Sequence, residues 1–132
     1  MKQPIRILHI DDEPGALSSF RRCLRREGFE IDSALTPGEA IQLVSQHHYD
    51  LVVIDVFMPE MNGFRLLEEL RSIDASLCSL VLTGIVDEAV LYQTVFSECE
   101  AYLEKPIDRD WLVFTVRRLL GERKRRALTP ST

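Results

Sequence analysis

Five polar side chains stand at the ends of four short apolar runs, and they carry the chemistry that this sequence offers. They are Asp11 and Asp12 after Ile5–Ile10, Asp55 at the end of Leu51–Asp55, Thr83 at the end of Leu80–Thr83, and Lys105 after Ala101–Leu103. Three carboxylates that converge repel one another, so at least one pKa should rise unless a cation neutralises them. Mg²⁺ suits such a site, because it binds few carboxylates, several waters and a substrate phosphate.

Asp55 is the candidate nucleophile of this group. It ends a run of apolar, mostly β-branched residues typical of a strand buried on both faces, and Pro59 and Asn62-Gly63 then break the chain. A carboxylate can attack phosphorus to give an acyl phosphate. The Lys105 ammonium and the Thr83 hydroxyl can meet phosphoryl oxygens. The set therefore predicts phosphoryl transfer to an aspartate.

The elements that must position these residues alternate along the chain. Apolar runs predict strands at 5–10, 29–34, 51–55, 80–83 and 101–103, and helical patterns follow each of them. The helices are expected to begin at Pro14, at the capping box Thr36-Pro37-Gly38-Glu39, near Gly63, at Asp87 and at Asp108. Such alternation predicts an α/β fold with a parallel sheet, helices on both faces, and a ligand site at the carboxyl ends of the strands.

Composition narrows the class of protein. The 132 residues suffice for one domain, and 45% hydrophobic with 28% charged residues is typical of globular proteins. A net charge of −5 gives the whole molecule no electrostatic footprint for nucleic acid. The three cysteines lack metal-ligand spacing, and no apolar run reaches the ~18 residues of a membrane span. We expect a cytoplasmic protein.

The motifs together resemble one known family. Asp11-Asp12, Asp55-x-x-Met58-Pro59-x-Met61-Asn62-Gly63, Leu82-Thr83-Gly84 and Tyr102-Leu103-x-Lys105-Pro106 are similar to the receiver domain of two-component response regulators, of the chemotaxis-regulator type. The likeness extends from about Ile5 to Leu120. It implies a flavodoxin-like, doubly wound (βα)5 fold whose five parallel strands have the order 2-1-3-4-5.

The resemblance also implies roles for residues of the site. Asp55 would accept a phosphoryl group from a histidine kinase or a histidine phosphotransfer protein. Asp12, Asp55 and the backbone carbonyl of Phe57 would bind Mg²⁺ directly, and Asp11 would act largely through water. Lys105 would pair with the phosphoryl group.

A second set of implied roles concerns the switch. Thr83 would move toward the phosphoryl group, and Tyr102 would rotate inward behind it. This change would alter the face made by the fourth helix, the fifth strand and the fifth helix, which is also the expected homodimer surface. The peptide between Lys105 and Pro106 is expected to be cis.

Three positions depart from the family pattern. Phe57 and Ile85 are apolar where the family often has polar residues, and bulky apolar groups there should keep water from the acyl phosphate. We therefore expect slow autodephosphorylation. Glu98 replaces a common Gly, so the fourth helix should end differently.

Other interpretations of the same residues remain open. A Mg²⁺-dependent phosphatase with an aspartate nucleophile is the enzymatic alternative, although such enzymes place a second Asp where this chain has Phe57. A flavin or nucleotide module would need a Gly-rich loop after the first strand, which is absent from the sequence. Tyr102 could be a packing residue alone, and His9 is expected to lie in the sheet with its ring satisfied by neighbours.

The domain organisation is expected to be simple. Residues 1–121 form the receiver domain, and residues 122–132 form a basic extension or a linker to an output domain that this chain lacks. The chain could equally be a complete single-domain regulator. Nucleic acid would be bound only through an output domain. Gly121 should weaken the last helix, although the basic stretch after it could extend that helix.

Overall fold

Five parallel strands form one sheet in the computed structural model, which describes residues 4–55, 62–84 and 99–128. The strands are β1 (Arg6–Ile10), β2 (Glu30–Ala34), β3 (Leu51–Asp55), β4 (Ser79–Thr83) and β5 (Ala101–Glu104). Their order across the sheet is β2-β1-β3-β4-β5, and every neighbouring pair is parallel. The predicted α/β fold and strand order are confirmed. Strand order reverses between β1 and β3, where fold principles place a ligand site.

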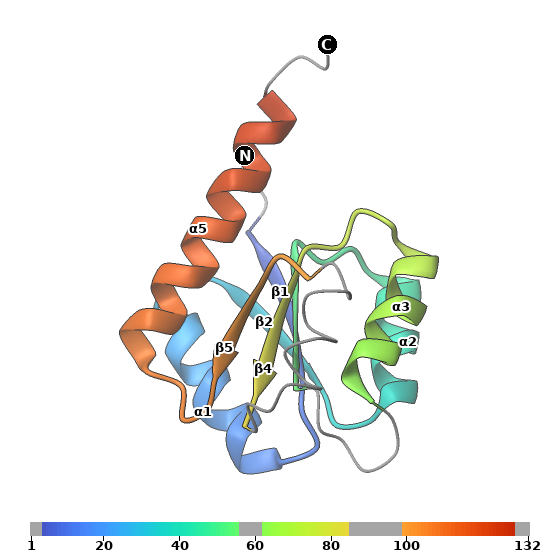
Figure 1. Ribbon diagram of the computed structural model, residues 1–132, viewed down its shortest axis with the longest axis horizontal. Coiled ribbons are helices and arrows are strands. Elements are labelled where there is room, and N and C mark those ends of the chain that lie inside the picture. The colour runs from blue at the N-terminus through green and yellow to red at the C-terminus, as the bar shows by residue number, and fades with distance from the viewer. Residues whose placement is uncertain (1–3, 56–61, 85–98, 129–132) are drawn as a thin grey trace.

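Helices cover both faces of the sheet (Figure 1). The described helices are α1 (Pro14–Arg25), α2 (Pro37–Gln46), α3 (Gly63–Ile73) and α5 (Arg109–Leu128). Apolar side chains of α1 and α5 pack on one face, and those of α2 and α3 pack on the other. The predicted fourth helix and Glu98 fall in residues 85–98, which lie outside the described residues.

The central strands are buried on both faces, because helices lie above and below them. Every residue of β3 and β4 is buried, which accounts for their unbroken apolar runs. Along β1, Ile7 belongs to the core under α1 and α5, whereas Leu8 and Ile10 belong to the core under α2 and α3. This alternation places His9 on the α1 side of the sheet.

Local signals set the helix ends as the sequence predicts. Thr36 caps α2, since its Oγ1 accepts the Glu39 N–H at 3.1 Å, and the Glu39 carboxylate accepts the Leu35 N–H at 3.1 Å. Asp108 caps α5 by accepting the Trp111 N–H at 2.9 Å. Gly28 has φ +90° in the turn after α1, a conformation that favours glycine.

The last helix is longer than the apolar pattern alone indicates. It continues through Gly121 to Leu128, so it crosses the predicted domain boundary without a break, and Figure 1 shows it running past the sheet. Of its predicted apolar residues, Leu112, Val116 and Leu119 are buried, whereas Trp111 and Phe114 are exposed and stack on each other. None of the described helices has the length and apolar character needed to cross a membrane.

Candidate functional site

The strand register brings the predicted site residues to one edge of the sheet. Ile10 is paired with Ile54, so Asp11 and Asp55 follow at neighbouring strand ends. Asp55 in turn is paired with Leu82, immediately before Thr83. Lys105 follows β5, and its backbone N–H donates to the Thr83 carbonyl at 2.8 Å.

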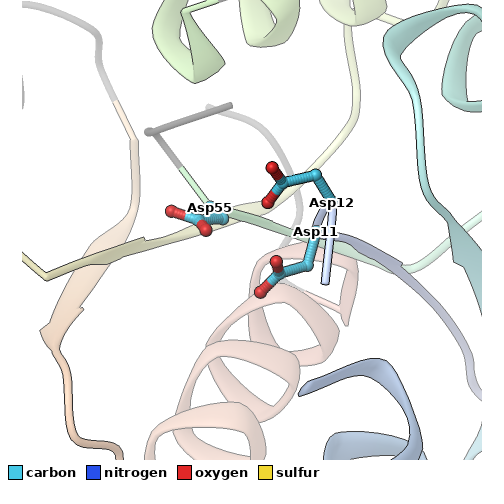
Figure 2. Close-up of side chains that lie close together, drawn as sticks. All are labelled: Asp11, Asp12 and Asp55. Atoms are coloured by element: carbon cyan, nitrogen blue, oxygen red, sulfur yellow. The ribbon is translucent and has the colours of Figure 1, made fainter. Parts of the chain in front are cut away.

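Three carboxylates gather at this edge. Asp11, Asp12 and Asp55 each offer one oxygen, and these oxygens lie within 4.8 Å of one another. Figure 2 shows the side chains converging from the end of β1 and the end of β3. Asp11 and Asp55 are buried, whereas Asp12 is partly exposed. The prediction that these three residues lie together is confirmed by the geometry.

Lys105 supplies the positive charge of the site. Its Nζ donates to Asp55 Oδ2 at 3.0 Å and lies 3.6 Å from Asp11 Oδ2. Burial by itself would lower the pKa of Lys105, but the hydrogen bond and charge of Asp55, with that of Asp11, raise it above its usual value. The ammonium therefore stays charged at neutral pH.

The surroundings of Asp11 disfavour the ionised form of its carboxyl group. Burial raises its pKa, and the charges of Asp55 and Asp12 add to that rise. The N–H of Glu13, which donates to Asp11 Oδ1 at 3.0 Å, and the Lys105 ammonium act in the opposite direction without cancelling the effect. One ammonium does not neutralise three carboxylates.

The donor set fits a hard divalent cation. All three ligand groups are carboxylates, the ligand type that Mg²⁺ prefers, and they stand where strand order reverses. Burial is the main cause of the raised pKa of Asp11, and a cation bound here would offset both that cost and the repulsion from Asp55 and Asp12. The residues present therefore fit the predicted Mg²⁺ site.

The other predicted site residues are Thr83, Pro106, Tyr102, Phe57 and Ile85. Thr83 is buried at the end of β4, and the Lys105-Pro106 peptide is cis, as expected. Tyr102 is 42% exposed, so it does not serve as a core residue in this structure. Phe57 and Ile85 lie outside the described residues.

The His9 ring lies in the sheet as predicted, but among the described residues it lacks the hydrogen-bond partners that were expected. The ring is buried and stacks on Phe20 with centroids 3.9 Å apart, but neither ring nitrogen has a hydrogen-bond partner in the described part of the chain. The prediction that neighbours satisfy this ring was wrong, since even Asp11 Oδ2 lies 4.0 Å from Nε2, beyond hydrogen-bond distance. Burial, with the charges of Lys105 and Arg21, lowers the pKa of His9 to about 3. A histidine inside an apolar strand run was the available signal.

Comparison with known proteins gives one consistent answer. A family model described as "Response regulator receiver domain" matches residues 7–117. The chain is 36% identical to the response regulator Rre1 of Synechocystis over 131 residues, covering 94% of this chain and 55% of Rre1. It is 32% identical to the transcriptional regulatory protein GlrR of Escherichia coli, covering 83% of this chain and 25% of GlrR.

Solved structures agree with these relatives. A response regulator receiver domain protein, described as CheY-like, from Methanospirillum hungatei superposes with a TM-score of 0.89 at 26% identity, covering 94% of this chain and 99% of that one.

The chain spans about half the length of Rre1 and of the response regulator MprA from Mycobacterium, of which it covers 55% and 51%.

Proposed function

The chain belongs to the response regulator receiver domain family of two-component systems, and from this premise we propose that Asp55 is its phosphoacceptor. A histidine kinase or a histidine phosphotransfer protein supplies the phosphoryl group. The observation that carries the proposal is the environment of Asp55, a buried carboxylate 3.0 Å from Lys105 Nζ and grouped with two further carboxylates.

The transfer needs little beyond positioning and charge. A carboxylate oxygen of Asp55 attacks phosphorus while the N–P bond of the donor phosphohistidine breaks. The electron pair of that bond leaves with the imidazole nitrogen, which then takes a proton from solvent. Lys105 shifts its hydrogen bond from Asp55 to a phosphoryl oxygen, and the Thr83 hydroxyl donates to another.

Mg²⁺ is the proposed cofactor. Asp12, Asp55 and the carbonyl of Phe57 would hold it directly, and Asp11 would hold it largely through water. When bound, the ion neutralises charge that develops on the phosphoryl oxygens. The support for this assignment is the all-carboxylate donor set and the unneutralised charge around Asp11.

Phosphorylation then changes the surface beside the site. We propose that Thr83 moves toward the phosphoryl group and that Tyr102, whose ring is 42% exposed, turns inward. The affected face includes β5 and α5; the fourth helix, which the family resemblance also assigns to this face, lies outside the described residues. This face is also the proposed surface for a homodimer of the activated protein.

The persistence of the signal is a further part of the proposal. Phe57 and Ile85 exclude water from the acyl phosphate, so the phosphoryl group is lost slowly. Residues 1–121 act as the receiver, and residues 122–132 form a basic extension or a linker to an output domain. Any contact with nucleic acid would be made through such a domain. The protein works in the cytoplasm as a switch, without an external substrate.

Beryllofluoride, which mimics a phosphoryl group, provides the test of this proposal. With Mg²⁺ present, the wild-type protein should bind beryllofluoride, observed by ¹⁹F NMR, and Asp55→Ala should bind none. Glu68→Gln, an exposed carboxylate of α3, serves as the matched control and should bind as the wild type does. Binding that persists in Asp55→Ala would contradict the proposal. Steady hydrolysis of phosphomonoesters by the wild type would favour the phosphatase alternative instead.

A further inference from the structure

His9 is a polar residue in a place that an apolar side chain could fill. Its ring is 2% exposed, lies on β1 between Leu8 and Ile10, and stacks on Phe20. Both ring nitrogens are buried without a hydrogen-bond partner among the described residues. Leaving a buried polar group unpaired costs about 1–3 kcal/mol. A phenylalanine would keep the stacking without this cost, so packing alone does not account for a histidine.

The polar group that the ring faces is a carboxylate of the proposed cation site. His9 Nε2 lies 4.0 Å from Asp11 Oδ2. The other oxygen of Asp11 already accepts the Glu13 N–H at 3.0 Å, whereas Oδ2 is 3.6 Å from Lys105 Nζ. Both distances to Oδ2 exceed the usual length of a hydrogen bond. Two donor groups, His9 Nε2 and Lys105 Nζ, thus lie near Oδ2 at distances longer than a direct hydrogen bond.

We propose that His9 is a positioning residue for the divalent cation site, whose Nε2–H donates to Asp11 Oδ2 when a cation occupies the acidic cluster. The inference rests on the proposed function, because it presumes that Asp11 belongs to a Mg²⁺ site. Carboxylates at metal sites are commonly held by hydrogen bonds from a surrounding layer of residues, and losing such a partner typically weakens metal binding 10- to 100-fold.

The ring is suited to this role in its neutral form. A neutral imidazole carries one N–H donor, and the tautomer protonated at Nε2 directs that donor at Asp11. A cavity of about 420 Å³ adjoins His9, Asp11 and Lys105. This space lets the side chains readjust by the distance that a direct hydrogen bond requires.

Mg²⁺ titration calorimetry on three proteins tests the proposal. His9→Phe keeps a flat ring against Phe20 and removes both nitrogens, whereas His9→Gln retains an N–H donor near the position of Nε2. We expect His9→Phe to weaken Mg²⁺ binding about tenfold. The Mg²⁺ affinity of His9→Gln should stay within about threefold of the wild-type affinity. If His9 only fills space in the core, His9→Phe should leave the Mg²⁺ affinity unchanged, whatever its effect on stability. Equal affinity in wild type and His9→Phe would overturn the proposal.

A spectroscopic measurement on the wild type does not depend on the variants folding. Long-range ¹H–¹⁵N correlation spectra report which ring nitrogen carries the proton. The Mg²⁺-loaded protein should show the Nε2–H tautomer, with its signal shifted on cation binding. An Nδ1–H tautomer in that state would overturn the proposal. If the wild type binds no Mg²⁺, the cation part of the proposed function fails; if only the His9 results fail, that function stands.

Discussion

The ionised form of Asp11 is destabilised in the folded protein, and a bound cation would stabilise it. The carboxylate is 1% exposed, and its pKa is raised by burial and by the neighbouring charges of Asp55 and Asp12. A raised pKa in the folded state means that stability falls as pH rises through that pKa, because the ionised form is disfavoured there. Without a divalent cation, this destabilisation is present wherever Asp11 is ionised in the folded protein.

Asp11→Asn should therefore stabilise the cation-free protein at pH 7. We expect its melting temperature to rise by about 3–6 °C, as a gain of ~1–2 kcal/mol would produce in a domain of this size. The difference from wild type should shrink as pH falls below about 4, the ordinary pKa of Asp, because Asp11 is then increasingly protonated in both the folded and the unfolded state. Added Mg²⁺ should stabilise the variant less than the wild type. Glu68→Gln is the exposed control, and a lower melting temperature for Asp11→Asn than for that control would contradict the account.

Phe57 is the residue proposed to set the lifetime of the signal. Phe57→Asn should speed loss of the phosphoryl group about tenfold, equivalent to ~1.4 kcal/mol in the hydrolysis barrier, because a polar group can admit and orient water. Decay of the acyl phosphate followed by ³¹P NMR measures the rate. Unchanged beryllofluoride binding would show that the site itself is intact. An unchanged or longer lifetime would refute this role.

The acidic cluster was predictable from sequence, whereas the environment of His9 was not. The site residues stand at or just after the ends of strand-like runs, and parallel strands bring such positions to one edge of the sheet. They are Asp11, Asp12, Asp55 and Lys105. Whether a buried imidazole finds a partner depends on distances of a few tenths of an ångström between side chains. Sequence patterns carry no such distances.

At the edge of the sheet opposite the carboxylates, a polar network joins α3, the start of β4 and the residue that precedes β5. Glu100 accepts the Ser79 N–H at 2.6 Å and the Ser79 hydroxyl at 2.7 Å, and Arg71 of α3 lies 3.2 Å from the same carboxylate. Ser79 is fully buried at the start of β4. The network ties α3 and β4 to the residue that precedes β5, and so holds the edge strand of the sheet.

Glu100→Ala should destabilise the fold, since the buried Ser79 N–H would lose its acceptor. We expect a loss of about 1–3 kcal/mol in the free energy of unfolding, measured by urea denaturation. Glu100→Gln keeps an acceptor oxygen and should lose less. Glu104→Ala, an exposed position on β5, is the control. A Glu100→Ala protein as stable as this control would show that the network contributes nothing.

Helix and strand ends followed local sequence signals, with one exception. Thr36, Asp108 and Gly28 act where capping and turn rules place them. The extent of α5 was left open because Gly121 costs only ~1 kcal/mol relative to alanine and keeps its N–H. A helix can continue through such a residue, so its end cannot be located from composition.

At the scale of the whole molecule, alternation predicted a parallel sheet but not its order. The five apolar runs are too alike in length and composition to specify which strands are neighbours. The order came from the family resemblance and is confirmed by the pairing of β1 with both β2 and β3. That reversal places Asp11 and Asp55 at adjacent strand ends, so the fold itself assembles the site.

Asp55 is the proposed phosphoacceptor, and its acyl phosphate can be trapped chemically. Incubation with Mg²⁺ and acetyl phosphate, a small phosphodonor, followed by borohydride reduction converts an acyl phosphate to an alcohol that peptide mass spectrometry can locate. We expect homoserine at position 55, formed only when Mg²⁺ is present and absent from Asp55→Asn. Modification at Asp11 or Asp12 instead of Asp55, or no modification with Mg²⁺ present, would contradict this assignment.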